Sequence, residues 1–176
     1  MNVRYPDPTT ISNRLLLKQA TRAAHARAEA RFVGPHGFRD HTAYACWLTA
    51  MMEVHMTVGL PAATVLDDAV LLTREDKRIR SLANDLGVPV TRRQSIPDRS
   101  MSWAWGVQYV LQGSALGASM LLKSGTIRPE WPRAYLREMQ HFATCGGLKQ
   151  FFAALESNTI DPAEAIQGAK EAFPKV

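Results

Sequence analysis

Apolar residues recur every three or four positions along most of the chain, and no clear run of residues alternates between apolar and polar. This spacing places apolar side chains on one face of an α-helix, whereas a half-buried strand would alternate. The pattern therefore predicts a compact all-α fold of about seven or eight helices. The expected helices span approximately residues 10–31, 40–57, 73–86, 101–123, 129–144, 148–156 and 162–173.

Some helix starts are marked by residues that cap helices. The clearest start is formed by Asp161, Pro162 and Glu164. An Asp side chain can accept hydrogen bonds from the unpaired backbone N–H groups of the first helical turn, and proline is well suited to the first helical position. Thr10 or Ser12 can begin the first helix in the same way.

Glycine and proline predict where other helices begin and end. The second helix is expected to stop before Gly59 and Pro61, because proline has no N–H for the helical hydrogen-bond ladder. Thr73 and Asp76 resemble a capping arrangement for a short basic helix, which Gly87 then closes.

The composition is that of an ordinary globular domain. Of 176 residues, 46% are hydrophobic and 21% are charged, which predicts a single domain over residues 1–176 with a core large enough to enclose a ligand. Residues 1–9 carry two prolines and are expected to form a flexible N-terminus. No run of about 18 apolar residues occurs, so no membrane span is expected.

The N-terminus and the cysteines bear on the cellular compartment. The first residues lack the apolar core of a secretory signal. Cys46 and Cys145 lie far apart in the sequence and without metal-ligand spacing, so we expect them to be reduced and buried. Together these features predict a cytoplasmic protein.

The chain is basic, with a net charge of +5 and an isoelectric point near 9.5. The basic residues are spread out, which argues against a nucleic-acid-binding protein. The denser groups are expected to form a solvated face, with an anionic ligand or an acidic protein partner as the alternative. They comprise Arg74, Lys77, Arg78 and Arg80, then Arg92, Arg93 and Arg99.

The segment LKQATRAAHARAE, residues 17–29, places Lys18, Thr21, His25 and Glu29 on one stripe of a helix. A carboxylate one turn away can orient the His25 imidazole and leave one ring nitrogen for a metal. Lys18 lies about 10 Å from His25 along the axis, roughly the distance from a haem iron to its propionates. The stripe is equally typical of a surface pair. No zinc pair is indicated by the other histidines, His36, His41, His55 and His141.

The segment WAWGVQYVLQGSALGASMLLKSG, residues 103–125, has the apolar content of a buried helix but contains Gly106, Gly113 and Gly117. Each interior glycine costs about 1 kcal/mol relative to alanine, so a compensating role is expected. Gly113 and Gly117 share a face. They can permit close packing of another helix or close approach of the backbone to a flat ligand, and the two interpretations are compatible.

Together the two segments resemble the haem oxygenase family. LKQATRAAHARAEARF is similar to its proximal helix, with the pattern Leu-Lys-x-Ala-Thr-(Lys/Arg)-x-x-His-x-x-x-Glu. GVQYVLQGSALGASML looks like the kinked distal helix of the bacterial members, including those associated with bacteriophytochromes. The resemblance extends over about residues 15–173, although only these two segments are specific. It implies a haem-oxygenase-like helical bundle, with haem between the proximal and distal helices.

The resemblance also implies an activity, in which haem b is both cofactor and substrate. An external donor, such as a ferredoxin, a flavodoxin-like protein or another reductase, supplies electrons. With O2, the ring is opened to biliverdin with release of CO and iron. A bacteriophytochrome is a conceivable recipient of the biliverdin, and iron recovery is an alternative purpose.

Residue roles follow from matching positions in the two motifs. His25 is the implied proximal ligand of the haem iron, Glu29 its carboxylate partner and Lys18 a propionate partner. Gly113 and Gly117 are implied to lie over the distal face and to steer dioxygen. Further contacts are expected from Tyr109 and Gln108, and further propionate partners from Lys149, Arg128 or Arg133.

Two positions depart from the family pattern. Ala118 stands where a second glycine is usual, and adds a methyl group where the backbone can approach haem. Ser114 stands in place of the acidic residue that organises distal water in mammalian members; it can hydrogen-bond a water but is not acidic. Two alternatives to an active oxygenase therefore stay open: a haem-binding or sensor protein that does not cleave haem, and an interaction module that uses its basic face.

Overall fold

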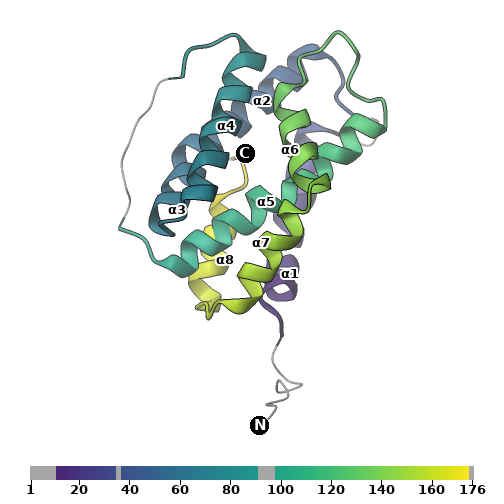
Figure 1. Cartoon of the computed structure of the whole chain (residues 1–176). Helices are drawn as coiled ribbons and strands as arrows, with labels where there is room; N and C mark the ends of the chain where they lie inside the picture. The colour runs from purple at the N-terminus through teal and green to yellow at the C-terminus, as the bar shows by residue number, and fades with distance from the viewer. Residues whose placement is uncertain (1–10, 35–36, 91–97, 175–176) are drawn as a thin grey trace, which may run out of the picture.

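The computed structural model describes residues 11–34, 37–90 and 98–174, and every regular element within these ranges is helical (Figure 1). Because α2, the π-helical turn η1 and α3 follow one another without a break, these elements form seven helical segments. The all-α expectation is confirmed. The elements are α1 (Asn13–Phe32), α2 (His41–Val54), η1 (His55–Gly59), α3 (Leu60–Val65), α4 (Ala69–Leu86), α5 (Met101–Lys123), α6 (Ala134–Thr144), α7 (Gly147–Ser157) and α8 (Pro162–Glu171).

The capping signals mark the starts of α1 and α8. The Ser12 side chain accepts a hydrogen bond from the Leu15 N–H, and Asp161 accepts one from the Glu164 N–H. Each bond satisfies a backbone donor that has no partner within the helix. The other proposed start, Thr10, and the expected flexible segment 1–9 lie outside the described residues.

The prediction that the second helix stops before Gly59 and Pro61 is wrong, because a π-helical turn carries the chain through this point. The Leu60 N–H donates to the His55 carbonyl, five residues earlier, as in a π-helix. Pro61 then falls in the first turn of α3, where a missing N–H breaks no helical bond.

Helix α4 begins earlier than Thr73 and Asp76 suggested. The Asp68 carboxylate accepts hydrogen bonds from the N–H groups of Val70 and Leu71, and so starts the helix at Ala69. The expected end at Gly87 is confirmed: this residue has φ of +66°, a left-handed conformation that glycine adopts without steric cost.

Helix α6 begins at Ala134, later than the expected start near residue 129, because a residue of another helix supplies its cap. The Asp85 side chain of α4 accepts hydrogen bonds from the N–H groups of Ala134 and Tyr135 at 2.9 and 2.8 Å. The local sequence carries no sign of this cap.

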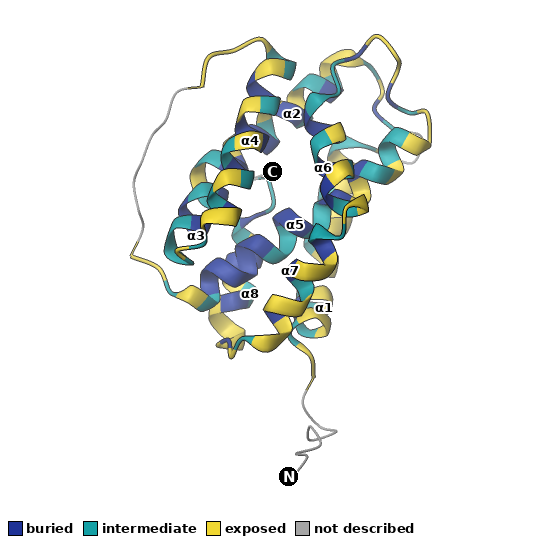
Figure 2. Cartoon of the chain, in the orientation of Figure 1, coloured by how far each residue is buried: buried dark blue, intermediate teal, exposed yellow. Residues whose placement is uncertain are grey.

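Helix α5 runs through the middle of the fold and packs against α8, α6, α3 and α7 (Figures 1 and 2). A continuous buried run, residues 103–108, lies in its N-terminal half, whereas the C-terminal half is buried on one side only. α8 crosses the N-terminal half so closely that a Cβ on Gly106 would overlap the Ala165 carbonyl, and one on Gly168 would overlap the Trp103 carbonyl. Close helix packing therefore accounts for Gly106.

Both cysteines are free thiols, but the expectation that they are buried is wrong. Cys46 lies on an exposed side of α2, and Cys145 forms the exposed C-terminal cap of α6. In the described parts of the chain, none of the helices is both long and apolar enough to span a membrane.

Candidate functional site

The C-terminal half of α5 has an open side, which we call the glycine face: Gly113, Leu116, Gly117 and Met120. A Cβ built on Gly113 or on Gly117 would meet no other atom within 4 Å. Leu116 and Met120 are 49% and 71% exposed beside them. Unlike Gly106, these two glycines are therefore not explained by helix packing in this structure.

His25 lies on the exposed side of α1, where its side chain is 63% exposed. Its Nδ1 atom is 3.5 Å from the Glu29 Oε2 atom, as the spacing of one turn predicted. The edge-on ring of Phe173, which follows α8, packs against the imidazole with 6.3 Å between ring centroids. Glu29 thus engages one ring nitrogen and leaves Nε2 as the available ligand atom.

The stripe predicted on α1 is divided by the fold. Lys18 is exposed like His25 and Glu29. Thr21 instead points into the core, is 5% exposed, and donates its hydroxyl hydrogen bond to the Leu17 carbonyl. A ligand on the outer side of α1 can therefore meet Lys18, His25 and Glu29 but not Thr21.

The remaining expected contact residues lie on α5 and α7. Tyr109 is half-buried and packs against Phe152 of α7, and burial raises the pKa of its hydroxyl. Lys149 is exposed on α7, which packs against both α1 and α5. Gln108 is fully buried on the side of α5 away from Gly117.

The two positions that depart from the family pattern face different surroundings. Ser114 is partly exposed next to Gly113, and its hydroxyl donates to the Leu111 carbonyl at 2.8 Å. Ala118 is 5% exposed and belongs to the main hydrophobic core. In this structure its methyl group therefore lies in the core, not on the glycine face.

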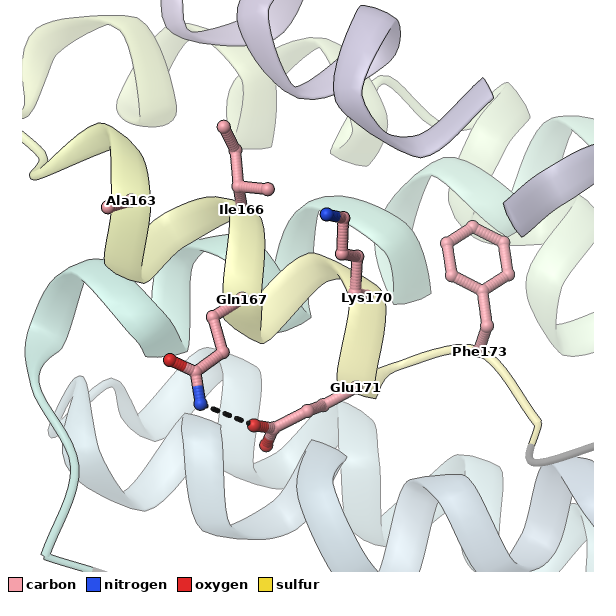
Figure 3. A pocket seen from close by; sticks show the side chains of 6 residues that line it. All are labelled: Ala163, Ile166, Gln167, Lys170, Glu171 and Phe173. Carbon is pink, nitrogen blue, oxygen red and sulfur yellow. Dashed lines mark hydrogen bonds between the residues drawn. The ribbon is translucent and has the colours of Figure 1, made fainter. Parts of the chain in front are cut away.

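His25 and the glycine face belong to helices that touch only slightly, since α1 packs mainly on α8 and α7. A hollow of about 470 Å³ lies along α8 and reaches Phe173, which contacts His25 (Figure 3). In this view Ile166, Lys170 and Phe173 point to one side of the α8 ribbon, whereas Gln167 and Glu171 point to its other side, where the Gln167 amide donates a hydrogen bond to Glu171. A second hollow of about 450 Å³ lies between α4 and α6. Neither is lined by His25, Gly113 or Gly117.

A group of buried polar residues lies behind the glycine face, on the other side of α5. Its members, the buried polar cluster, are each at most 1% exposed: His55, Glu75, Arg78, Gln108, Gln112 and Tyr135. Glu75 is its centre, because its Oε2 atom is 2.6 Å from His55 Nδ1 and its Oε1 atom is 3.0 Å from Arg78 Nη1. His55 Nε2 lies 3.0 Å from the Tyr135 hydroxyl.

The two glutamines connect this cluster to α5 and to the π-helical turn. The Gln112 side-chain oxygen accepts a hydrogen bond from Arg78, and its amide donates to Gln108, which in turn donates to the Gly59 carbonyl. A Cβ on Gly59 would lie 2.6 Å from Glu75 Oε2, so the glycine makes room for this carboxylate. Among the side-chain nitrogen and oxygen atoms of the described residues, only Arg78 Nε is buried without a hydrogen-bond partner.

Charge balance keeps Glu75 ionised inside the protein. Burial alone would raise the pKa of this carboxyl group, but the attraction of His55 and Arg78 and their hydrogen bonds hold it below its ordinary value. Burial raises the pKa of the Tyr135 hydroxyl, which therefore stays protonated. A charged pair that is fully out of water stabilises a fold little by itself, so its presence invites a functional explanation.

Sequence reasoning missed this cluster, and its placement of Arg78 on a solvated basic face is wrong. Arg78 is completely buried because it shares the inner side of α4 with Leu71, Glu75, Ile79 and Leu82. The spacing of Glu75 and Arg78 on that apolar stripe was an available signal. Of the other basic residues, Lys77 pairs with Glu138 and Arg80 with Asp76, while Arg92 and Arg93 lie outside the described residues.

The described ranges contain no group of three or more His, Cys, Asp or Glu residues that could hold a metal ion. A single histidine with an open ring nitrogen, such as His25, would hold only a metal whose other ligands come from a cofactor. The comparison with models of known protein families finds no match, and the comparison with curated proteins finds no significant one.

Proposed function

We propose that this protein binds haem b between α1 and α5 and, as a haem oxygenase, opens the ring to biliverdin, CO and iron with O2 and external electrons. The glycine face of α5 is the observation that carries the proposal. Two glycines there leave open space beside a helix backbone and have no packing partner to explain them.

The physical argument for a ligand rests on helix stability. Each glycine in the interior of α5 costs about 1 kcal/mol relative to alanine. Gly106 has the packing of α8 as compensation, but Gly113 and Gly117 have none. A flat apolar ligand that lies against the bare backbone and the exposed Leu116 and Met120 side chains supplies the missing reason.

His25 has the properties of an axial ligand. It is accessible, it lies on a regular helix, and Glu29 engages its Nδ1 atom so that the Nε2 atom is available for iron. Lys18 on the same side of α1 and Lys149 on α7 are the basic groups proposed to pair with the propionates, and Tyr109 offers a further polar contact.

Bound haem would supply both the iron that activates O2 and the ring that is cut. The chain itself would position this group: His25 would be its iron ligand, and Gly113 and Gly117 would allow it to approach the α5 backbone closely. Ser114 is the polar side chain next to the glycine face that can hydrogen-bond water there.

One observation favours the second candidate, a haem-binding protein that does not cleave haem. The Ser114 hydroxyl donates to the Leu111 carbonyl, and the glycine face carries no acidic side chain. A protein of this kind would hold haem through the same His25 and the same glycine face.

Titration with hemin tests the proposal. His25→Ala is expected to abolish the ligation band of bound haem, while the control His141→Ala, at another exposed helical histidine, is expected to retain it. Addition of a reductant in air should then convert wild-type haem into biliverdin in a single turnover. Stable haem without this product would favour the second candidate, and no haem ligation would refute both.

The partners of the reaction are proposed on the same basis. An electron donor of the ferredoxin or flavodoxin type, or another reductase, would reduce the iron. A bacteriophytochrome is a proposed recipient of biliverdin. Docking of an acidic donor to basic residues such as Lys77 and Arg99 should weaken as salt is added, and donor-dependent turnover that is independent of ionic strength would contradict it.

A further inference from the structure

The His25 imidazole is in contact with an aromatic side chain from the other end of the chain. Phe173 lies two residues beyond the end of α8, and its ring meets the imidazole with 6.3 Å between the ring centroids and 85° between the ring planes. This is the T-shaped arrangement that aromatic pairs prefer, at a separation within their usual range. Figure 3 shows the Phe173 ring directed to the same side of α8 as Ile166 and Lys170.

The position of Phe173 depends on how α8 packs against α5. At Gly168 the two backbones come so close that a Cβ would overlap the Trp103 carbonyl. Helices in such close contact cannot shift relative to each other without a clash. After α8, the Phe173 N–H donates to the Lys170 carbonyl at 3.4 Å, which continues the helical turn up to the aromatic residue. Phe173 is therefore held at a defined place relative to α5.

α8 also connects α5 to the helix that carries His25. α1 packs against α8, whereas α1 and α5 touch each other only slightly. The position of His25 relative to the glycine face is therefore set mainly through α8. Phe173 extends this connection from the helix backbones to the imidazole itself.

His25 needs such support because its other contact is loose. The side chain is 63% exposed, and its Nδ1 atom lies 3.5 Å from Glu29 Oε2, which is longer than a well-formed hydrogen bond. An exposed side chain that is free to turn loses conformational entropy when it binds a ligand, and this loss weakens binding. A ring packed against the imidazole restricts its rotation before the ligand arrives.

We propose that Phe173 is a positioning residue, which holds the His25 imidazole in the orientation that leaves Nε2 open to a ligand. The inference rests on the proposed function, in which that ligand is the haem iron. Phe173 acts through His25, and because α8 is fixed on α5, it keeps the imidazole in a constant place relative to the glycine face.

The order of the His25 ring can be measured without haem. NMR relaxation of its ring C–H groups gives an order parameter, which we expect to fall below about 0.6, the range of flexible groups, in Phe173→Leu. Phe32→Leu is the matched control, because Phe32 is also partly buried and lies on α1, but its ring meets the Arg31 guanidinium. F32L should leave the order of the His25 ring unchanged.

Hemin titration measures the consequence for binding. F173L should bind hemin roughly twofold to tenfold more weakly, the size of one aromatic contact, and F32L should bind it like the wild type. Phe173→Tyr keeps the ring and is expected to restore both the order of the imidazole and the affinity. Should F173L fail to fold, Phe173→Met offers a flexible apolar side chain without a ring, and the same results are expected of it.

The outcomes separate the positioning role from the proposed function. An unchanged order parameter in F173L overturns the positioning role, whether or not hemin binds. Wild-type hemin affinity in F173L, despite a disordered imidazole, also overturns it and leaves haem binding intact. Absence of hemin binding in the wild type refutes the proposed function. The order parameter then decides alone: a fall confined to F173L supports the positioning of His25.

Discussion

Replacing Gly113 and Gly117 by alanine should stabilise the haem-free protein. A Cβ at either position meets no other atom within 4 Å, so the substitution adds no clash. It removes the glycine penalty in the interior of α5, about 1 kcal/mol per site. The double variant should therefore gain about 2 kcal/mol, equivalent to roughly 4–8 °C in Tm for a chain of this size.

Urea unfolding and thermal melting without hemin measure this gain, with Gly106→Ala as the matched control on the same helix. A Cβ on Gly106 would overlap the backbone of Ala165. The overpacking in G106A should therefore lower the free energy of unfolding by about 1–3 kcal/mol or more. A loss of stability in G106A together with a gain in the double variant would show that helix packing explains Gly106 but not Gly113 and Gly117.

Hemin binding completes the experiment. Methyl groups on the glycine face would hold a flat ligand away from the backbone, so the stabilised double variant should bind hemin about tenfold more weakly or more. A double variant that melts below the wild type would refute the open-space argument. A variant that is stabilised and binds and cleaves haem normally would refute the assignment of this face to haem.

Three further predictions concern the core and the helix ends. Glu75→Gln should cost about 3–5 kcal/mol in urea unfolding, because it leaves Arg78 buried beside a neutral group, and a loss below 1 kcal/mol would contradict this account. Burial would raise the pKa of Glu75, but His55 and Arg78 hold it below 4.5, so its contribution to stability is present above about pH 4.5 and is lost as pH falls through the folded-state pKa. The unfolding free energy of E75Q should accordingly vary less between about pH 5 and 2 than that of the wild type, and parallel curves would refute the linkage. Asp161→Ala should cost about 1 kcal/mol by removing the cap of α8, which thermal melting can test against Glu164→Ala.

Local chemistry made several elements predictable from the sequence. α5 spans the expected residues 101–123, and Asp161 with Pro162 marks the start of α8, because periodicity and caps act within a few residues. The start of α6 was not predictable, because Asp85, about fifty positions earlier in the chain, caps it. Likewise, the passage through Pro61 depends on a π-helical turn whose Gly59 makes room for Glu75 of another helix.

In the candidate site, too, local contacts were predictable from the sequence, whereas features that depend on the tertiary fold were not. The spacing of His25 and Glu29 predicted their contact, which the structure contains at 3.5 Å. The distinction between Gly106 and Gly117 could not come from the sequence, because both are interior glycines of one apolar helix. It depends on where α8 crosses α5, which is a property of the tertiary fold.

The two sides of α5 carry opposite energetic features, and this opposition is the strongest reason to treat the helix as functional. Gln108 and Gln112 on one side belong to a fully buried charged cluster, while Gly113 and Gly117 on the other lower helix propensity beside open space. Stability alone would favour apolar side chains on the buried polar side of α5, and alanine at the two glycine positions. A helix that departs from both preferences at once is what a surface that must hold a ligand closely would require.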